Sequence, residues 1–347
     1  MKIKNLSAED FMLFDKIDMK FSDNINVIFG ENSTGKTALI KTLYSSSKLL
    51  ADNSDTKEDQ EKFLLNKLIG VFQPDKSSIG RLVARQQGGG KAKVSVSFDK
   101  LSKVEFNFGY KQTNHLSLNV SKEKGDFIPI FLPPKEIISS TGNFTSLYDD
   151  YHIEFDETYY DLARLLLRPL KKGKNTDEQN GILSNFSDIM NGNVIQRDNH
   201  FFLNVKGSGE FEMGLVSEGF RKLSTLTYLI LSGSLNRKSI LFWDEPETNM
   251  NPKMIYHIAN SLIELSQMGV QVFITTHSYF IQQAFNLMSC YPKKDSKPIK
   301  INFISLYRDN NNNKVVYESS NSLDGIQHNA IMEEFDHLYD WEQELMG

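Results

Sequence analysis

Apolar positions along the chain follow two spacings that separate strand-like from helix-like regions. A compact apolar run over residues 25–29 leads into a glycine-bounded loop, and a helical spacing of apolar residues follows over 37–50. A polar, acidic stretch over 51–61 is typical of a surface connection. Strands with period-two alternation or short apolar runs are then predicted over residues 94–98, 104–108, 116–120 and 127–132.

The remaining chain changes from helical spacing back to an alternation of strands and helices. Residues 135–191 have mainly helical patterns, and 201–213 resembles a hairpin. Further strands are predicted over 240–243, 270–275, 299–306 and 315–317, and helices over 253–268 and 326–341. The apolar face of the last helix is interpreted as core or as an oligomer contact.

These patterns predict an α/β fold with one core and a large insertion. Residues 1–134 and 215–347 would form the core, which would include an antiparallel β layer over about 92–132. Residues 135–214 would form a mostly helical insertion.

Charge and composition narrow the functional classes. The net charge of −5 argues against a protein that coats nucleic acid by bulk charge, although a local basic patch could still bind it. The densest basic cluster is 171–174, for which nucleic-acid binding and a solvated surface are both open. The single cysteine excludes an intramolecular disulfide, and the histidines form no zinc-spaced cluster. We expect a cytoplasmic protein without a membrane span, because no apolar run is long enough and no signal-peptide layout is present.

One segment matches a phosphate-binding loop in full. The pattern G-x-x-x-x-G-K-[ST] is formed by Gly30, Glu31, Asn32, Ser33, Thr34, Gly35, Lys36 and Thr37. The preceding strand and following helix are the context that this motif requires. Backbone N–H groups of such a loop surround the β-phosphate of ATP, Lys36 would bridge the β- and γ-phosphates as a catalytic residue, and the Thr37 hydroxyl would bind Mg²⁺. The alternative is a chance glycine loop.

Two carboxylates and a histidine follow later strands. Asp244 and Glu245 end an apolar strand, where side chains of an open α/β sheet face the ligand crevice. Asp244 suits a magnesium contact and Glu245 suits the general base for the attacking water, whereas the pair alone would also fit a helix start. His277 ends the next strand and could contact the γ-phosphate or position the water; a structural role is the alternative.

A third motif gives the chain a family resemblance. The segment Val216-Ser217-Glu218-Gly219-Phe220-Arg221-Lys222-Leu223 resembles the signature motif of ABC-type ATPases of the SMC and RecF-like branch. Together with the phosphate-binding loop, this resemblance implies a P-loop NTPase of ABC type that uses ATP and Mg²⁺. It also implies that Ser217 and Gly219 contact ATP bound by a second protomer, in a homodimer or higher homo-oligomer. Residues 249–252 resemble the D-loop of that interface.

The chain departs from the SMC pattern in three places. Gln73 is the candidate for the glutamine-loop residue near the metal, and Pro133-Pro134-Lys135 is a rival switch segment. The arginine that SMC-like relatives often place near the N-terminus is missing, since the first arginine is Arg81. The long coiled coil is also replaced by the compact stretch 135–191.

The compact form narrows the resemblance further. Residues 243–247 and 276–278 are similar to small bacterial ATPases of overcoming-lysogenisation-like systems. This resemblance implies a separately encoded effector and a role in anti-phage defence. No toprim nuclease is expected in the 69 residues after Ser278. A transporter nucleotide-binding subunit, a RecF-like ATPase acting on DNA and a non-enzymatic ATP-gated scaffold are the alternatives.

Overall fold

The centre of the protein is a mixed sheet whose strands come from both ends of the chain. The computed structural model describes all residues except 86–88, 122–125, 152–153, 293–296, 311 and 347. Within that part, the sheet has the strand order β14-β13-β3-β12-β11-β7, and only β14 is antiparallel to its neighbour. The strands are β3 (Ile25–Gly30), β7 (Ile128–Leu132), β11 (Ser239–Asp244), β12 (Gln271–Thr276), β13 (Ile301–Arg308) and β14 (Val315–Ser320).

Burial on both faces explains the continuous apolar runs of the central strands. Every residue of β3, β11 and β12 is buried, as expected for parallel strands covered on two sides. Alternate residues enter two cores: Phe242 packs with helix α1 (Lys36–Ala51), whereas Trp243 packs with the helices of the other face. Those helices are α6 (Glu218–Leu231), α7 (Pro252–Gln267) and α8 (Tyr279–Cys290).

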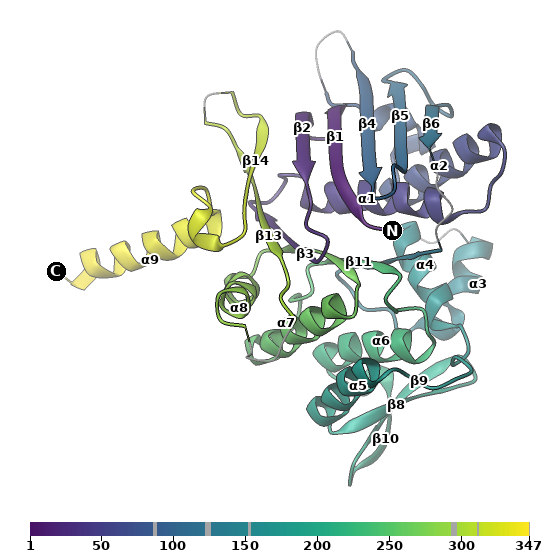
Figure 1. The fold of residues 1–347 in the computed structure, drawn as a ribbon, viewed down its shortest axis with the longest axis vertical. Coiled ribbons are helices and arrows are strands. Elements are labelled where there is room, and N and C mark those ends of the chain that lie inside the picture. Colours follow the sequence, from purple (N-terminus) through teal and green to yellow (C-terminus); the bar gives the residue numbers. More distant parts are fainter. Residues whose placement is uncertain (86–88, 122–125, 152–153, 293–296, 311, 347) are drawn as a thin grey trace.

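A separate antiparallel sheet lies over α1 on the opposite side from α7 (Figure 1). Among the described strands its order is β2-β1-β4-β5-β6. Its strands are β1 (Ile3–Phe11), β2 (Phe14–Lys20), β4 (Lys91–Phe98), β5 (Lys103–Gly109) and β6 (Ser117–Ser121). The predicted antiparallel layer is therefore confirmed for its first three predicted strands.

The end of that predicted layer is wrong. Residues 128–132 form β7, which pairs in parallel with β11 in the central sheet instead. Four of its five residues are buried, so it has the continuous apolar run of a strand covered on both faces, not the alternation of a half-exposed one.

The second helix, α2 (Lys57–Phe72), begins within the predicted surface connection over 51–61 and takes up its last part, residues 57–61. Thr56 caps the start of this helix: its side chain accepts a hydrogen bond from the Asp59 N–H. Its apolar face is narrow, since only Leu64, Lys67, Leu68 and Val71 are buried, and this weak periodicity explains the error. Short 3₁₀ turns follow at η1 (Asp75–Ser77) and η2 (Ile79–Leu82).

The described part of residues 135–214 forms helices and a small sheet. The helices are α3 (Thr141–Tyr151), α4 (Glu157–Leu166) and α5 (Asp177–Met190). Helices α3 and α4 lie at the side of the molecule near α2, and α5 and the small sheet lie at the end away from β1 and β2 (Figure 1). In the described residues, β8 (Gly192–Arg197), β9 (His200–Val205) and β10 (Gly209–Glu212) pair in the order β10-β9-β8, followed by η3 (Met213–Leu215). The hairpin was expected, whereas β8 was not.

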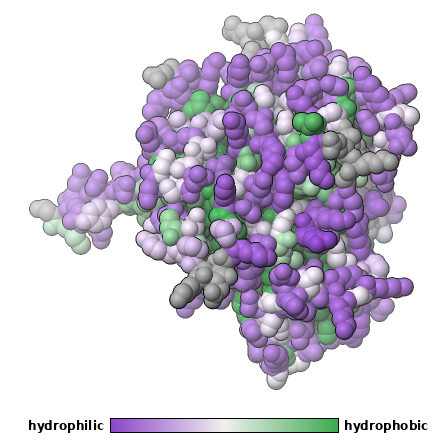
Figure 2. All heavy atoms as spheres, viewed as in Figure 1, coloured by the Kyte–Doolittle hydropathy of each residue, from purple (hydrophilic) through white to green (hydrophobic). Residues whose placement is uncertain are grey.

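The last helix, α9 (Ala330–Met346), follows η4 (Leu323–Gly325) and projects away from the body (Figures 1 and 2). None of its residues, all of which the structure describes, is buried. Its apolar side chains therefore do not belong to the core, and the oligomer contact stays a prediction. No described helix meets the length and apolarity needed to cross a bilayer.

Candidate functional site

The phosphate-binding loop connects the end of β3 to the start of α1. Gly30 and Gly35 have φ angles of +141° and +95°, which favour glycine. Gly30 pairs with Leu306 of β13, and a Cβ on Gly30 would lie 1.9 Å from the Leu306 carbonyl oxygen. The first glycine of the motif is therefore required both by backbone conformation and by close contact with β13.

We expect Gly30→Ala to destabilise the protein by at least about 3 kcal/mol, because the methyl group collides with a central strand. Gly207→Ala is the matched control. Its φ is also positive, at +80°, but nothing lies within 4 Å of the added Cβ. Thermal unfolding of both variants separates the collision from the conformational cost, and equal stability of the two would contradict this interpretation.

Lys36 lies over the loop with its ammonium group buried among oxygen atoms. It is 6% exposed and donates hydrogen bonds to the carbonyl oxygens of Gly30, at 2.9 Å, and Glu31, at 2.7 Å. Burial lowers its pKa to about 8, and the nearby carboxylates of Glu245 and Asp244 oppose that shift. The group is therefore mostly protonated at pH 7 and available for an anionic ligand.

Thr37 and Asp244 meet at the start of α1. The Thr37 hydroxyl lies 3.0 Å from a carboxylate oxygen of Asp244, and the Thr275 hydroxyl donates to the same carboxylate. Asp244 is 3% exposed; burial raises its pKa, and the two hydroxyl groups act in the opposite direction. A hydroxyl and a buried carboxylate side by side are the hard oxygen ligands that fit Mg²⁺.

The described residues contain no group of three or more His, Cys, Asp or Glu side chains able to hold a metal ion. Mg²⁺ is commonly bound by one or two carboxylates together with substrate phosphates and water, so Thr37 and Asp244 are the residues that would hold it here.

Glu245 and His277, predicted from separate strands, are neighbours in the structure. Glu245 follows β11 with φ +47°, and its N–H donates to the Thr275 carbonyl oxygen at 3.1 Å. Glu245 Oε1 lies 3.5 Å from His277 Nε2, and each side chain is 34% exposed. Both side chains are thus partly open to solvent.

The protonation of His277 leads to a pH prediction. Burial and then the Lys36 charge lower its pKa below the ordinary 6.5, against the opposing effect of Glu245. We expect an NMR titration half-point below 6.5, with His277→Ala used to assign the signal. The ring is then neutral at pH 7 and gains its charge only in more acidic solution. A half-point above 6.5 would contradict this.

Glu247 is a site residue that the sequence analysis named only as part of a family motif. Its Oε1 accepts hydrogen bonds of 2.7 Å from the Thr276 hydroxyl and from the His277 N–H. Burial raises its pKa, and Oε2 is buried without a partner among the described atoms. Glu247 therefore positions His277 through the hydrogen bond to its backbone N–H. Its spacing after Pro246 was the available signal, since a turn there returns a carboxylate toward the neighbouring strand.

The signature segment is tied to the loop that follows Glu245. Lys222 of α6 donates to the carbonyl oxygens of Pro246, at 3.1 Å, and Thr248, at 2.7 Å. Ser217 caps α6 by position but its side chain makes no capping hydrogen bond, and it is exposed. Gly219 is buried, with the Met250 side chain 3.6 Å from where a Cβ would lie. Among the described residues, no hydrogen bond or ion pair joins Ser217 to the phosphate-binding loop of its own chain.

Gln73 ends α2 in a left-handed conformation, and its side-chain amide donates to the Phe155 carbonyl oxygen at 2.8 Å. None of its described contacts reaches Thr37 or Asp244. Its role as a metal ligand therefore stays a prediction.

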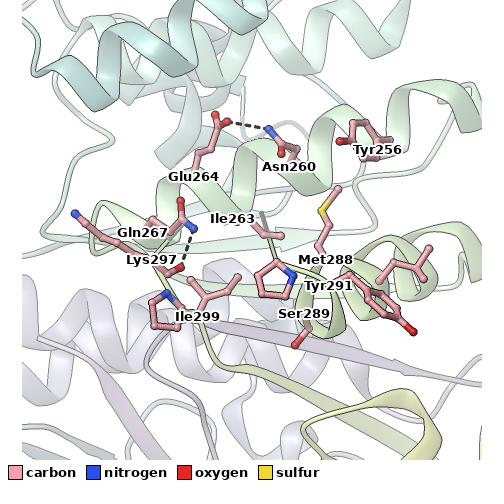
Figure 3. A pocket seen from close by; sticks show the side chains of 13 residues that line it. Tyr256, Asn260, Ile263, Glu264, Gln267, Met288, Ser289, Tyr291, Lys297 and Ile299 are labelled. Atoms are coloured by element: carbon pink, nitrogen blue, oxygen red, sulfur yellow. Dashed lines mark hydrogen bonds between the residues drawn. The ribbon is translucent and has the colours of Figure 1, made fainter. Parts of the chain in front are cut away.

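One cavity lies apart from these residues. It has a volume of about 370 Å³ and lies between α7 and α8, where Tyr256, Ile263 and Met288 line it (Figure 3). None of the predicted site residues lines it.

Comparison with known proteins places the core in a family. The family model described as "AAA domain, putative AbiEii toxin, Type IV TA system" matches residues 25–281, from β3 into α8. The chain belongs to this family. The matched residues include the phosphate-binding loop, the signature segment, the acidic pair and His277.

Curated relatives match over shorter segments. A DNA replication and repair protein RecF of Halalkalibacterium halodurans is 32% identical over 99 residues, covering 27% of this chain and 26% of that protein. A second, from Exiguobacterium sp., is 28% identical over 145 residues, covering 41% and 34%. The chain thus spans about a quarter to a third of the length of these relatives.

Solved structures confirm the predicted fold class. The SmcHead bound to the C-winged helix domain of ScpA aligns with a TM-score of 0.56 at 13% identity, over 92% of this chain and 98% of that one. The Pyrococcus furiosus Smc head domain with an extended coiled coil, bound to the C-terminal domain of ScpA, gives 0.53 at 12% identity, over 97% and 99%. At these identities the likeness concerns the fold alone.

Proposed function

We propose that the protein hydrolyses ATP between two copies of the chain, and that the ATP-bound dimer controls a separately encoded effector, in bacterial anti-phage defence. One observation carries the enzymatic part: Glu245 and His277 lie within 3.5 Å of each other, and the charges of Glu245 and Lys36 both act on His277. A base, a phosphate-binding cation and a metal-binding pair are thereby gathered at one end of the sheet.

Each side chain has a separate task in this proposal. Lys36 turns from the loop carbonyls to the β- and γ-phosphates, and Glu245 accepts the proton of the attacking water. His277, neutral at pH 7, hydrogen-bonds the water or the γ-phosphate, while Glu247 fixes its backbone. Thr37 and Asp244 would hold Mg²⁺, which when bound neutralises charge on the phosphates.

The exposed signature supports the dimeric arrangement. The Ser217 hydroxyl lies at the N-terminus of α6 and makes no capping hydrogen bond. Helix N–H groups at this position favour an anion. Asn249 of the D-loop candidate donates to Glu218 at 3.0 Å, so the two segments that would face a second copy are joined on one surface. The proposed consequence is that ATP stabilises the dimer and hydrolysis loosens it.

The effector and defence role rests on the resemblance of the motifs to small defence-associated ATPases. The relatives named as RecF favour the alternative of an ATPase that acts on DNA. The transporter alternative has no comparable support.

ATP turnover with and without duplex DNA distinguishes these functions. We expect Mg²⁺-dependent hydrolysis that DNA leaves unchanged. DNA stimulation that falls steeply with salt concentration would instead support the RecF-like alternative, because phosphate contacts release counterions. Absence of Mg²⁺-dependent hydrolysis under all of these conditions would contradict the enzymatic proposal.

A further inference from the structure

The end of β13 reaches the outside of the phosphate-binding loop. β13 runs parallel to β3, with Leu306 opposite Gly30, and continues to Arg308, which pairs with Val315 of β14 and lies beyond the end of β3 beside the loop. Its Nη2 donates to the Ser33 carbonyl oxygen at 3.1 Å, and its Nη1 donates to the Asn313 carbonyl oxygen at 3.0 Å. One guanidinium therefore joins the β13–β14 hairpin to the loop.

The contacted carbonyl fixes the direction of a neighbouring N–H group. In a trans peptide the C=O of Ser33 and the N–H of Thr34 point in opposite directions. Ser33 has φ +60°, an uncommon conformation for a residue with a side chain, which persists only where its surroundings hold it. With the Ser33 oxygen held outward by Arg308, the Thr34 N–H is directed to the inside of the loop.

We propose that Arg308 is a positioning residue of the ATP site, which keeps the Ser33–Thr34 peptide turned so that its N–H meets the β-phosphate. The inference rests on the proposed function, because it assumes that this loop binds ATP. It adds a residue from the C-terminal hairpin, distant in sequence from every motif of the core.

Charge strengthens the effect of this hydrogen bond. The described contacts of the Arg308 guanidinium are to two neutral carbonyl groups, those of Ser33 and Asn313. A cation that donates to a peptide oxygen polarises the peptide and makes its N–H a better donor. Arg308 is also partly exposed, so shortening it leaves no buried cavity.

The test uses the full chain with Arg308→Ala, measuring ATP and ADP affinity with fluorescent analogues together with the steady-state KM and kcat. We expect both affinities to fall about tenfold and KM to rise in parallel, the scale of losing one hydrogen bond to a charged group, with kcat changed less than about twofold. ATP and ADP should be affected equally because both carry the β-phosphate. Arg308→Lys should restore most of the affinity, because its ammonium group keeps the positive charge and can donate to the Ser33 carbonyl oxygen.

Controls keep the result interpretable. Arg81→Ala removes an exposed arginine paired with Asp75 at 2.8 Å and should leave both affinities unchanged. If Arg308→Ala does not fold, Arg308→Gln, which keeps part of the side chain but not the charge, should show the same shared loss. If Arg308→Ala keeps both affinities, or loses affinity for ATP alone, the inference is overturned. The proposed function is still supported in that case, provided that the native chain binds ATP. A native chain that bound no ATP would overturn both.

Discussion

Glu245→Gln will bind ATP but hydrolyse it at least about a hundredfold more slowly than the native chain, the lower range of a general-base contribution. The amide has the size of the carboxylate but cannot take a proton from water. The neighbouring ligands of the phosphates are unchanged, so affinity should persist. Phosphate release at saturating ATP and Mg²⁺ measures the loss, and the same variant should accumulate as an ATP-bound dimer in native mass measurements.

Glu264→Gln is the matched control for this change. Glu264 lies near the C-terminal end of α7, about 20 Å along the helix from the residues that follow Glu245. The control should turn over ATP at the native rate. Full turnover by Glu245→Gln would contradict its assignment as the base.

Lys36→Ala will lose most ATP binding, with affinity lower by at least about tenfold, since a charge-assisted contact to phosphate disappears. The effect should exceed that of any exposed lysine because Lys36 is buried at the loop itself. Equilibrium binding of a fluorescent ATP analogue measures it, and a thermal melt shows whether the fold persists. Lys16→Ala, at a side chain that is 78% exposed, is the control. Native ATP affinity in Lys36→Ala would contradict the assignment of the loop.

The fold was predictable where local pattern and burial agree. The apolar run over 25–29 and the helical spacing after it correspond within one residue to β3 and α1. Sheet membership was not predictable for β7, because pairing with β11 depends on residues more than a hundred positions away. The narrow buried face of α2 gave too little periodicity to predict a helix.

The candidate site was predictable to the extent that strand ends carry its residues. The structure brings Lys36, Thr37, Asp244, Glu245 and His277 together because β3, β11 and β12 are parallel and end at the same edge. Glu247 and Arg308 act through backbone groups of other segments. The position of Glu247 after Pro246 was a weak signal, and no sequence spacing encodes the contact of Arg308. The proposed task of Ser217 needs a second chain, so one polypeptide cannot show it.

Mixing two inactive variants tests that dimeric site most directly. Lys36→Ala keeps an intact signature, and Ser217→Arg keeps an intact phosphate-binding loop. In a mixed dimer one of the two sites combines both intact halves, so the mixture should recover up to about a quarter of native ATP turnover when dimers form at random. Native mass measurement of the mixture verifies that mixed dimers are present. If mixed dimers form and turnover stays at the level of the separate variants, Ser217 does not serve a neighbouring chain and the central claim is wrong.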